Sequence, residues 1–232
     1  MNKIIAISGL KGSGKDESAL MLQYCLSVPK WLRTYKLYKL LRNLVPTHYK
    51  ITSFARVLKE SLAVLLGIDV QNFEDRNFKE NWYIHFPTLD ITNNPPKNLI
   101  LNDKQFNRRI QTDVKLVVNN YLTIREVLQL WGTEVVRNIL GDKFWVLRTL
   151  NTDDDVIISD LRFKVEYESV KSSSGITIYI NRDLEPGMHQ SESECIELWK
   201  SNKFDFVVNN TGTLNDLFVK ISEISDNIKN GV

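Results

Sequence analysis

Residues 3–18 read Lys-Ile-Ile-Ala-Ile-Ser-Gly-Leu-Lys-Gly-Ser-Gly-Lys-Asp-Glu-Ser, and this stretch decides the fold. The apolar run Ile4 to Ile7 has the length of a buried parallel strand. Residues 9–15 fit the pattern G-x-x-x-x-G-K, and the residues from Lys15 onward read as the start of a helix. A strand, a glycine-rich turn and a helix in this order predict a phosphate-binding loop.

Such a loop holds phosphate for simple physical reasons. Glycines allow successive backbone N–H groups to turn toward phosphate oxygens, and the helix N-terminus adds a partial positive charge. Lys15 supplies a mobile ammonium group for the outer phosphates. The stretch therefore predicts a phosphorylated ligand.

One position departs from the usual sequence of these loops. Walker A loops carry Ser or Thr after the lysine, where the hydroxyl group holds Mg²⁺, and this chain has Asp16. A carboxylate there can bind the ion, directly or through water, or contact the attacking phosphate. The alternative is an Asp that the helix dipole alone favours in the first turn. We expect a chemical role for Asp16.

The composition is that of a globular protein without a bias toward one class of partner. Of 232 residues, 43% are hydrophobic and 25% are charged, and the net charge is +2. This length suits one domain with an insertion. No stable nucleic-acid or membrane partner is expected, because the chain has neither a large charge excess nor an apolar run of about 20 residues.

The two cysteines indicate a reduced compartment. Cys25 and Cys195 are too few and too far apart for a disulfide framework, and they fit no metal-ligand spacing. Residues 1–8 run directly into the phosphate loop, so we do not expect a signal peptide. A cytoplasmic location is the simplest interpretation.

A basic stretch follows the first helix, which is expected from Lys15 toward Leu26 and ends before Pro29. Residues 30–50 place aromatic side chains at helical spacing among lysines and arginines, with no acidic residue. We interpret this stretch as an added amphipathic helix with a solvated basic face. The alternatives are attraction of anionic substrates, or weak contact with nucleic acid or a membrane.

A second strand at 49–54 leads into an apolar helix at 55–66. Ligands of open α/β sheets bind outside the carboxyl ends of the strands. Arg56 and Lys59, in the first turns of this helix, are therefore placed to reach an anion. The alternative is that both are ordinary exposed residues.

Residues 68–120 are the least regular part of the sequence. Pro87, Pro95 and Pro96 interrupt any long element. We interpret 68–120 as an insertion that covers the site and is partly helical near 103–119. Lids of phosphoryl-transfer enzymes are often such segments, because they must close and exclude water.

A helix with an unusual polar face is predicted after the insertion. Thr123 and Glu126 form a capping box, and the helix is expected to run through Arg137. Gly132 costs a helix interior about 1 kcal/mol relative to Ala, so we expect it to allow close approach by a ligand. One face carries residues suited to a polar ligand: Arg125, Gln129, Gly132 and Thr133.

A second set of charged residues follows a short buried strand at 156–159. The strand delivers Asp160 to its carboxyl end, where a Walker-B-type carboxylate would lie. Glu166 is four residues beyond Arg162, on the same face if a helix follows. The alternative is a surface salt-bridge set, but a carboxylate that ends a buried strand beside a phosphate loop favours function.

The last part of the chain completes an alternating pattern. Strands are expected at 176–180 and 204–208, separated by a polar loop at 183–195. The turn at 209–213 leads into a closing helix from Leu214.

Together these segments resemble the deoxynucleoside monophosphate kinases of bacteriophages, within the wider nucleoside monophosphate kinase family. The order and spacing of the segments are more specific than the phosphate loop alone, and they cover most of the chain. The resemblance rests on S-G-L-K-G-S-G-K-D (8–16), S-F-A-R-V-L-K-E (53–60), R-E-V-L-Q-L-W-G-T-E (125–134), D-K-F-W-V (142–146), I-I-S-D-L-R-F-K-V-E (157–166), H-Q-S-E (189–192) and N-N-T-G-T-L (209–214).

The resemblance implies an α/β fold of the P-loop nucleoside monophosphate kinase type. It implies three layers: a parallel sheet of about five strands with helices on both faces, in a single domain, 1–232, with a partly helical lid at 68–120. It implies transfer of the γ-phosphate of ATP to the 5′-phosphate of a deoxynucleoside monophosphate, with Mg²⁺ as cofactor. It places the protein in the cytoplasm, that of the host if a phage encodes it, and it is compatible with a homodimer.

The resemblance also implies roles for individual residues. The phosphate loop, its helix and the turn at 210–213 would hold ATP: Lys11, Gly12, Ser13, Gly14, Lys15, Asp16, Glu17, Asn210 and Gly212. Three segments would bind the acceptor: Lys59, Glu60, Arg125, Gln129, Gly132, Thr133, Arg137, Arg162 and Glu166. The metal would lie near Asp16 and Asp160. The reaction itself would depend on Lys15, Asp16, Arg125, Asp160, Arg162 and Glu166.

The charges of the reacting phosphates suggest separate roles for the two arginines. We expect Arg125 on the acceptor phosphate and Arg162 near the transferring group, oriented by Glu166. Two departures from the family remain: the basic stretch 30–45 is longer than expected, and the usual R-F-P-N-E reads R-F-K-V-E at 162–166. The second change keeps the spacing of the ion pair.

Three other functions stay open at this point. Phosphomevalonate kinases also carry a G-K-D loop, and dephospho-coenzyme A kinase shares the architecture. A nucleotide-dependent switch, or an ATPase that binds nucleic acid, has only the basic stretch 30–50 in its favour.

Overall fold

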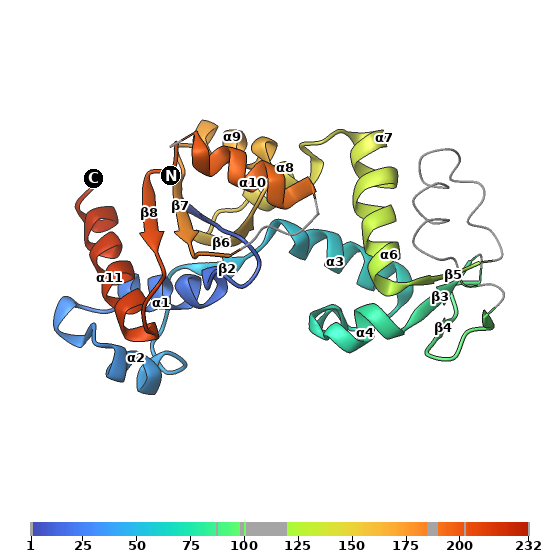
Figure 1. Cartoon of the computed structure of the whole chain (residues 1–232), viewed down its shortest axis with the longest axis horizontal. Helices are drawn as coiled ribbons and strands as arrows, with labels where there is room; N and C mark the ends of the chain where they lie inside the picture. The colour runs from blue at the N-terminus through green and yellow to red at the C-terminus, as the bar shows by residue number, and fades with distance from the viewer. Residues whose placement is uncertain are drawn as a thin grey trace. The chain divides into compact units, whose positions relative to one another are not determined.

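The chain folds into two compact units (Figure 1). The first unit comprises Met1–Phe54 and Val146–Val232, and the second comprises Ala55–Trp145. The predicted insertion, 68–120, falls inside the second unit. The computed structural model describes residues 2–86, 88–97, 100, 120–184, 190–201 and 203–231.

A five-stranded parallel sheet forms the centre of the first unit. Its order is β2-β6-β1-β7-β8, and every pair of neighbours is parallel. All five strands lie within or beside the predicted positions, so the predicted α/β fold is confirmed. The strands are β1 (Ile4–Ser8), β2 (Lys50–Thr52), β6 (Val156–Leu161), β7 (Ile176–Asn181) and β8 (Phe206–Asn209).

Helices cover both faces of this sheet. Ile5 and Ile7 pack with residues of α1 and α11, whereas Ile4 and Ala6 pack with residues of α9 and α10. This alternation follows from strand geometry, which points successive side chains to opposite faces. The helices are α1 (Lys15–Ser27), α9 (Lys164–Ser172), α10 (Gln190–Lys200) and α11 (Leu214–Asn230).

The polar loop predicted at 183–195 is wrong in its second half. Helix α10 begins at Gln190 and buries Cys195 and Leu198 against the sheet. The first five residues of the helix, 190–194, are all polar, so its start shows no apolar periodicity. The helix predicted near 103–119 lies outside the described residues. None of the described helices is long and apolar enough to cross a membrane.

The basic stretch 30–50 is not one continuous helix. It contains a 3₁₀ turn, η1 (Lys30–Leu32), and a short helix, α2 (Tyr35–Leu41), before the chain enters β2. Tyr38 of α2 is completely buried, and its ring lies 5.5 Å from those of both Tyr24 and Phe218. The stretch therefore packs on α1 and α11 through one aromatic face.

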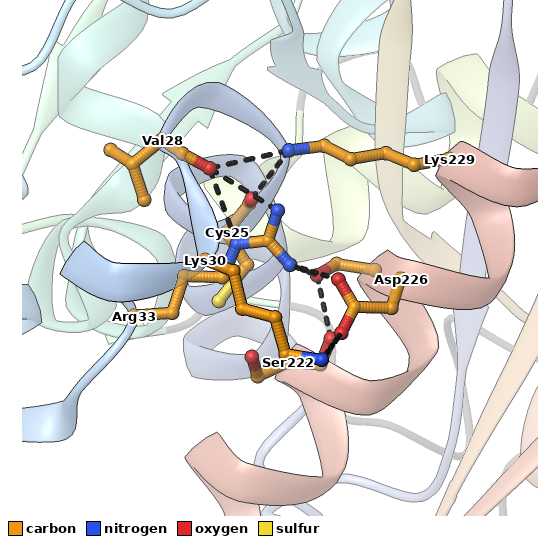
Figure 2. Close-up of polar contacts among 8 residues, drawn as sticks. Cys25, Val28, Lys30, Arg33, Ser222, Asp226 and Lys229 are labelled. Carbon is orange, nitrogen blue, oxygen red and sulfur yellow. Dashed lines mark hydrogen bonds and ion pairs between the residues drawn. The ribbon is translucent and has the colours of Figure 1, made fainter.

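Arg33 anchors the same stretch through a partly buried ion pair (Figure 2). Its guanidinium group, 4% exposed, pairs with Asp226 of α11 and donates to the Val28 carbonyl at 3.2 Å. Lys229 of α11 donates to the carbonyls of Cys25 and Val28, at 3.1 and 3.3 Å. The two cations thus satisfy carbonyls at the end of α1, which have no partner within the helix.

The second unit is built of short helices around a small antiparallel sheet. The sheet order is β4-β3-β5. Its strands, β3 (Tyr83–His85), β4 (Ile91–Thr92) and β5 (Tyr121–Thr123), were not predicted, because two or three residues are too few for an alternating pattern. Ile84 and Leu122 are fully buried and pack with the helices of the unit.

The helices of the second unit include one change of helix type. The capping box is confirmed: the Glu126 N–H donates to Thr123 Oγ1 at 3.2 Å, and Glu126 Oε2 accepts from the Thr123 N–H at 2.7 Å. The helix is an α-helix only to Gln129 and then becomes a π-helix. The helices are α3 (Phe54–Leu66), η2 (Val70–Glu74), α4 (Arg76–Asn81), α6 (Ile124–Gln129), η5 (Leu130–Arg137) and α7 (Asn138–Leu140). Helix α8 (Phe144–Leu150) follows, and most of it belongs to the first unit.

Candidate active site

The phosphate loop connects β1 to α1, as predicted (Figure 1). Gly12 and Gly14 have φ angles of 83° and 95°, in the left-handed region that glycine adopts readily. The Ser13 N–H donates to the Leu10 carbonyl at 3.1 Å, so the loop turns tightly before the helix begins at Lys15. Among the described residues, the Ser13 hydroxyl is buried and has no hydrogen-bond partner.

Asn210, which directly follows β8, forms a hydrogen bond with the phosphate loop. Its side-chain amide donates to the Ser13 carbonyl at 2.8 Å, and its backbone N–H donates to the Asn181 carbonyl at 2.7 Å. A Cβ atom at Gly14 would lie 2.7 Å from the Asn210 amide nitrogen, so the two residues are in close contact. The side chain of Asn210 is therefore engaged by the loop, while Gly212 of the same turn is exposed.

Lys15 is the buried cation of the site. It is 6% exposed, and its Nζ donates to the Leu10 carbonyl at 3.4 Å. Burial lowers the pKa of Lys15, the Arg162 guanidinium lowers it further, and the carboxylates of Asp16 and Asp160 oppose this shift. The structure thus brings three other predicted site residues, Asp16, Asp160 and Arg162, within electrostatic range of Lys15.

Sheet topology explains why Asp160 lies near the loop. Its strand, β6, is the neighbour of β1, and Ser8 at the start of the loop pairs with Leu161. Asp160 Oδ1 accepts a hydrogen bond from the Phe54 N–H at 2.7 Å. The half-buried Asp160 and the exposed Asp16 are the two carboxylates predicted to hold a metal.

Arg162 and Glu166 are close, but not as predicted. Helix α9 begins only at Lys164, so the two residues do not share a helical face. The buried carboxylate of Glu166 instead accepts from the backbone N–H groups of Arg162 and Phe163, at 2.8 and 3.0 Å. The chain leaves β6 in an extended conformation at Phe163, and this residue separates Arg162 from the helix.

Two other residues of the predicted ATP site differ in their surroundings. Lys11 is exposed on the loop. Glu17 is half-buried, and its Oε1 accepts from the Tyr38 hydroxyl at 2.7 Å and lies 3.6 Å from an Arg42 nitrogen. These contacts connect Glu17 to the basic stretch.

Sequence reasoning missed Arg182. One of its guanidinium nitrogens donates to the Gly12 carbonyl at 3.3 Å, which places a cation beside the phosphate loop. The residue follows directly on β7, at the carboxyl end of the strand next to β1. The rule that selected Asp160, that ligands lie outside the carboxyl ends of parallel strands, also applies to Arg182.

The second unit pairs the predicted acceptor-binding residues with acidic side chains. Lys59 lies 2.8 Å from Glu74, and Arg125 lies 2.9 Å from Glu80. Glu60, also predicted to bind the acceptor, pairs with Arg56 one helical turn away at 2.7 Å. The first two ion pairs hold cations that a bound anion can engage.

Gly132 is not exposed with Arg125 and Gln129, the other described residues of the expected polar stripe. Arg125 and Gln129 are exposed, but Gly132 is buried, and a Cβ atom there would lie 2.9 Å from Leu58 Cδ2. The change to a π-helix at Leu130 rotates the residues that follow, because each π-helical turn holds more residues. The close approach is therefore made by a side chain of α3.

The remaining predicted residues of this helix can be placed only in part. Thr133 lies within the π-helix, and its side chain is outside the described part of the structure. Arg137 ends the π-helix and is half-buried. Within the described ranges, no group of three or more His, Cys, Asp or Glu side chains is arranged to hold a metal ion.

The sequence of this chain is similar to the sequences of known proteins. The family model for deoxynucleotide monophosphate kinase matches residues 3–221. The deoxynucleotide monophosphate kinase of Escherichia phage RB69 is 22% identical over 253 residues, covering 96% of this chain and 99% of that protein. The enzyme of the same name from Enterobacteria phage T4 is 21% identical over 257 residues, with coverages of 94% and 97%.

A solved structure, the dephospho-CoA kinase from Campylobacter jejuni, is similar with a TM-score of 0.40 and 14% identity, over 100% of this chain and 99% of that one. The family model spans nearly the whole sequence, including the phosphate loop, Asp160 and Arg162. The chain therefore belongs to the deoxynucleotide monophosphate kinase family.

Proposed function

We propose that this protein transfers the γ-phosphoryl group of ATP to the 5′-phosphate of a deoxynucleoside monophosphate, with Mg²⁺ as cofactor. One observation carries the proposal: the phosphate loop places the buried Lys15 within electrostatic range of Asp16, Asp160 and Arg162, in a chain of this family. A buried cation with two carboxylates and an arginine suits polyphosphate chemistry.

The loop suits the phosphates of ATP. Gly12 and Gly14 adopt left-handed backbone conformations that turn N–H groups inward. The Ser13 hydroxyl, which lacks a partner among the described residues, gains one if a phosphate oxygen approaches it. The phosphates are assigned to the loop and the first helical turn: Lys11, Gly12, Ser13, Gly14, Lys15 and Asp16. The exposed part of the turn at 211–213, which includes Gly212, is assigned to the ATP base.

The carboxylates of Asp16 and Asp160 suit Mg²⁺, which prefers oxygen ligands and usually keeps several of its waters. They come from the first turn of α1 and the carboxyl end of β6, which meet at the phosphate loop. Bound Mg²⁺ would offset negative charge on the phosphate oxygens. The site needs no third protein carboxylate, because nucleotide phosphates and water supply the other ligands.

The acceptor phosphate is assigned to cations of the second unit. Lys59 and Arg125 each form an ion pair with a glutamate. On binding, the 5′-phosphate would replace that glutamate as their partner. Gln129 is exposed one turn from Arg125 and adds a polar contact. Glu60, Gly132, Thr133 and Arg137 stay as predictions for this site, and the packing of Gly132 against Leu58 leaves it only an indirect role.

The reaction follows from charge. A phosphate oxygen of the acceptor is already nucleophilic, so the protein has to align two anions and offset their charge. Lys15 and Arg162 interact with the transferring group, and Glu166 fixes the backbone that carries Arg162. Arg125 holds the acceptor.

A coupled assay of ADP formation tests the proposal. Acceptors are dAMP, dCMP, dGMP, dTMP, their ribose counterparts, phosphomevalonate and dephospho-coenzyme A, with DNA alone as a further arm. We expect turnover with at least one deoxynucleotide, and loss of turnover in Lys15→Met but not in Lys3→Met, whose lysine is exposed and lies outside the phosphate loop. Turnover with phosphomevalonate or dephospho-coenzyme A alone, or ADP formation that needs only DNA, would contradict it.

Further parts of the proposal concern partners and place of action. The partners are ATP and a deoxynucleoside monophosphate, and no stable complex with nucleic acid or a membrane is expected. A homodimer is compatible with the proposal, and light scattering of the purified protein measures it directly. We assign the activity to the cytoplasm, which is the host cytoplasm for a phage protein.

A further inference from the structure

Three cations from three elements of the second unit, Lys59, Lys79 and Arg125, lie within electrostatic range of two carboxylates. Lys59 of α3 pairs with Glu74 at 2.8 Å, and Arg125 of α6 pairs with Glu80 at 2.9 Å. Glu80 is the neighbour of Lys79 in α4, and Glu74 lies one element earlier, in η2. Even without the exposed Arg76, which also pairs with Glu80, these three cations carry one positive charge more than the two carboxylates neutralise.

Lys79 is the unexplained member of this cluster. It is half-buried, and within the described part of the chain its ammonium group makes neither a hydrogen bond nor an ion pair. Burial lowers the pKa of Lys79, and the positive charges of Lys59 and Arg125 lower it further, against the opposing effect of Glu74 and Glu80. Its neighbours Lys59 and Arg125 already form ion pairs. Among the described residues of this cluster, Lys79 is therefore the cation whose N–H groups are left to donate to a ligand.

A half-buried ammonium group close to two other cations is costly unless an anion compensates it. The two carboxylates are already held by Lys59, Arg125 and the exposed Arg76. A phosphate monoester fits the remaining need, because it carries close to two negative charges and three terminal oxygens that accept hydrogen bonds. A single carboxylate ligand offers less charge and fewer acceptors.

We propose that Lys79 is a substrate-binding residue that donates to the 5′-phosphate of the acceptor monophosphate, beside Lys59 and Arg125. This inference rests on the proposed function and adds a residue that sequence reasoning did not select. On binding, the phosphate replaces Glu74 and Glu80 as the partner of Lys59 and Arg125, and Lys79 gains a hydrogen bond that it lacks among the described residues. The residue should therefore act on binding of the acceptor and not on binding of ATP.

The test is a kinetic comparison of Lys79→Met, Lys79→Arg and Arg76→Gln with the wild-type protein. Arg76 is the matched control: it lies in the same helix and carries the same charge, but its side chain is 78% exposed. KM for the deoxynucleotide, KM for ATP, kcat and the melting temperature are measured for each. The deoxynucleotide is the one that the wild-type protein turns over best.

Lys79→Met should raise KM for the deoxynucleotide about 10- to 100-fold, the usual effect of losing a hydrogen bond to a charged group. KM for ATP should change less than about twofold, and Lys79→Arg should restore most of the loss because it keeps the charge. Arg76→Gln should change KM for the deoxynucleotide less than about twofold, because exposed charges contribute little.

Two results would overturn the inference. Unchanged KM for the deoxynucleotide in a folded Lys79→Met variant would show that Lys79 is not in the acceptor site, and the proposed function would stand. If Lys79→Met fails to fold, Lys79→Gln replaces it, with the same criterion. A wild-type protein that phosphorylates no nucleoside monophosphate would reject the proposed function and this inference together.

Discussion

The carboxylate of Glu166 accepts a hydrogen bond from the backbone N–H of Arg162 at 2.8 Å. Glu166 is only 3% exposed, and it also accepts from the Phe163 N–H. The contact fixes the chain between β6 and α9, so it fixes the point from which the Arg162 side chain projects. Glu166 therefore positions the backbone of Arg162, the residue that we propose acts on the transferring group.

Replacing Arg162 should damage catalysis and leave the fold intact. Arg162→Ala removes a cation that offsets charge in the transition state, so we expect kcat to fall by about 100-fold or more. The coupled assay measures kcat, and thermal unfolding checks the fold. Lys164→Ala, two residues away and 70% exposed, is the control. Turnover close to that of the wild-type protein would reject the role of Arg162.

Replacing Glu166 should affect both stability and catalysis. Glu166→Ala leaves two backbone N–H groups without this acceptor, which should lower the free energy of unfolding by about 1–3 kcal/mol. Glu166→Gln keeps one acceptor oxygen, so its kcat should lie between those of Glu166→Ala and the wild type. Urea unfolding and the coupled assay measure the two effects. A stable Glu166→Ala variant with full activity would show that the contact positions nothing.

Replacing Asn210 should weaken binding of ATP and leave binding of the acceptor unchanged. Asn210→Ala removes the donor to the Ser13 carbonyl, so the phosphate loop loses one of its supports. We expect a loss of about 1 kcal/mol in unfolding free energy and a higher KM for ATP, with KM for the deoxynucleotide unchanged. Asn209→Ala is the control, because its side chain bonds only the exposed Asn181 amide in the contacts described, at 2.9 Å. Equal effects of both variants on KM for ATP would argue against a special role of Asn210.

The titration of Lys15 gives a pH-dependent prediction. In the folded protein without ligand, burial and Arg162 hold the pKa of Lys15 below its ordinary value of 10.5. Between the lowered pKa and 10.5, the unfolded chain binds more protons than the folded one, so the contribution of Lys15 to stability rises with pH in this window. Bound phosphates favour the ammonium form and raise the pKa again, so ATP binding should take up protons in alkaline solution.

Calorimetry in two alkaline buffers with different ionisation enthalpies measures this uptake. The apparent binding enthalpy of ATP should depend on the buffer for the wild type and for Lys3→Met, whose lysine is exposed and lies outside the phosphate loop. In Lys15→Met, any remaining binding should not depend on the buffer. Identical enthalpies for the wild type in both buffers would contradict a lowered pKa of Lys15.

Substitutions of Gly132 distinguish two explanations for a glycine at this position: packing against Leu58 and close approach by a ligand. Gly132→Ala should change stability by less than about 1 kcal/mol, because gained helix propensity offsets a small shift of the flexible Leu58 side chain. Gly132→Val should cost about 1–3 kcal/mol through overpacking. Combining Gly132→Val with Leu58→Ala should recover part of this loss, measured by urea unfolding. A higher KM for the acceptor without any loss of stability would instead restore the ligand explanation.

The sequence predicted best where local pattern and topology agree. The run Ile4 to Ile7, the glycines of the loop and the apolar helix that follows form one continuous signal, and the structure confirms each part. The capping box at Thr123 and Glu126 is equally local. Asp160 could be placed near the loop because a parallel sheet brings the carboxyl ends of its strands to one edge.

The sequence was least predictive where the structure depends on a single residue or on a very short element. A shift from α-helix to π-helix at Leu130 leaves no mark on apolar periodicity, yet it turns Gly132 toward Leu58. The strands of the small sheet are too short to show alternation. Lys79 stands alone among neighbours of mixed charge, and only the packing of α3, α4 and α6 reveals the cations around it.

The anchoring of Arg33 has a consequence for the order in which the chain matures. Arg33 and its partner Asp226 are 193 positions apart in the sequence, and Lys229 reaches the same end of α1 from as far away. During synthesis the N-terminal residues leave the ribosome long before α11 exists. Helix α1, and with it the phosphate loop that it carries, therefore acquires its full set of contacts only when translation has reached the last helix.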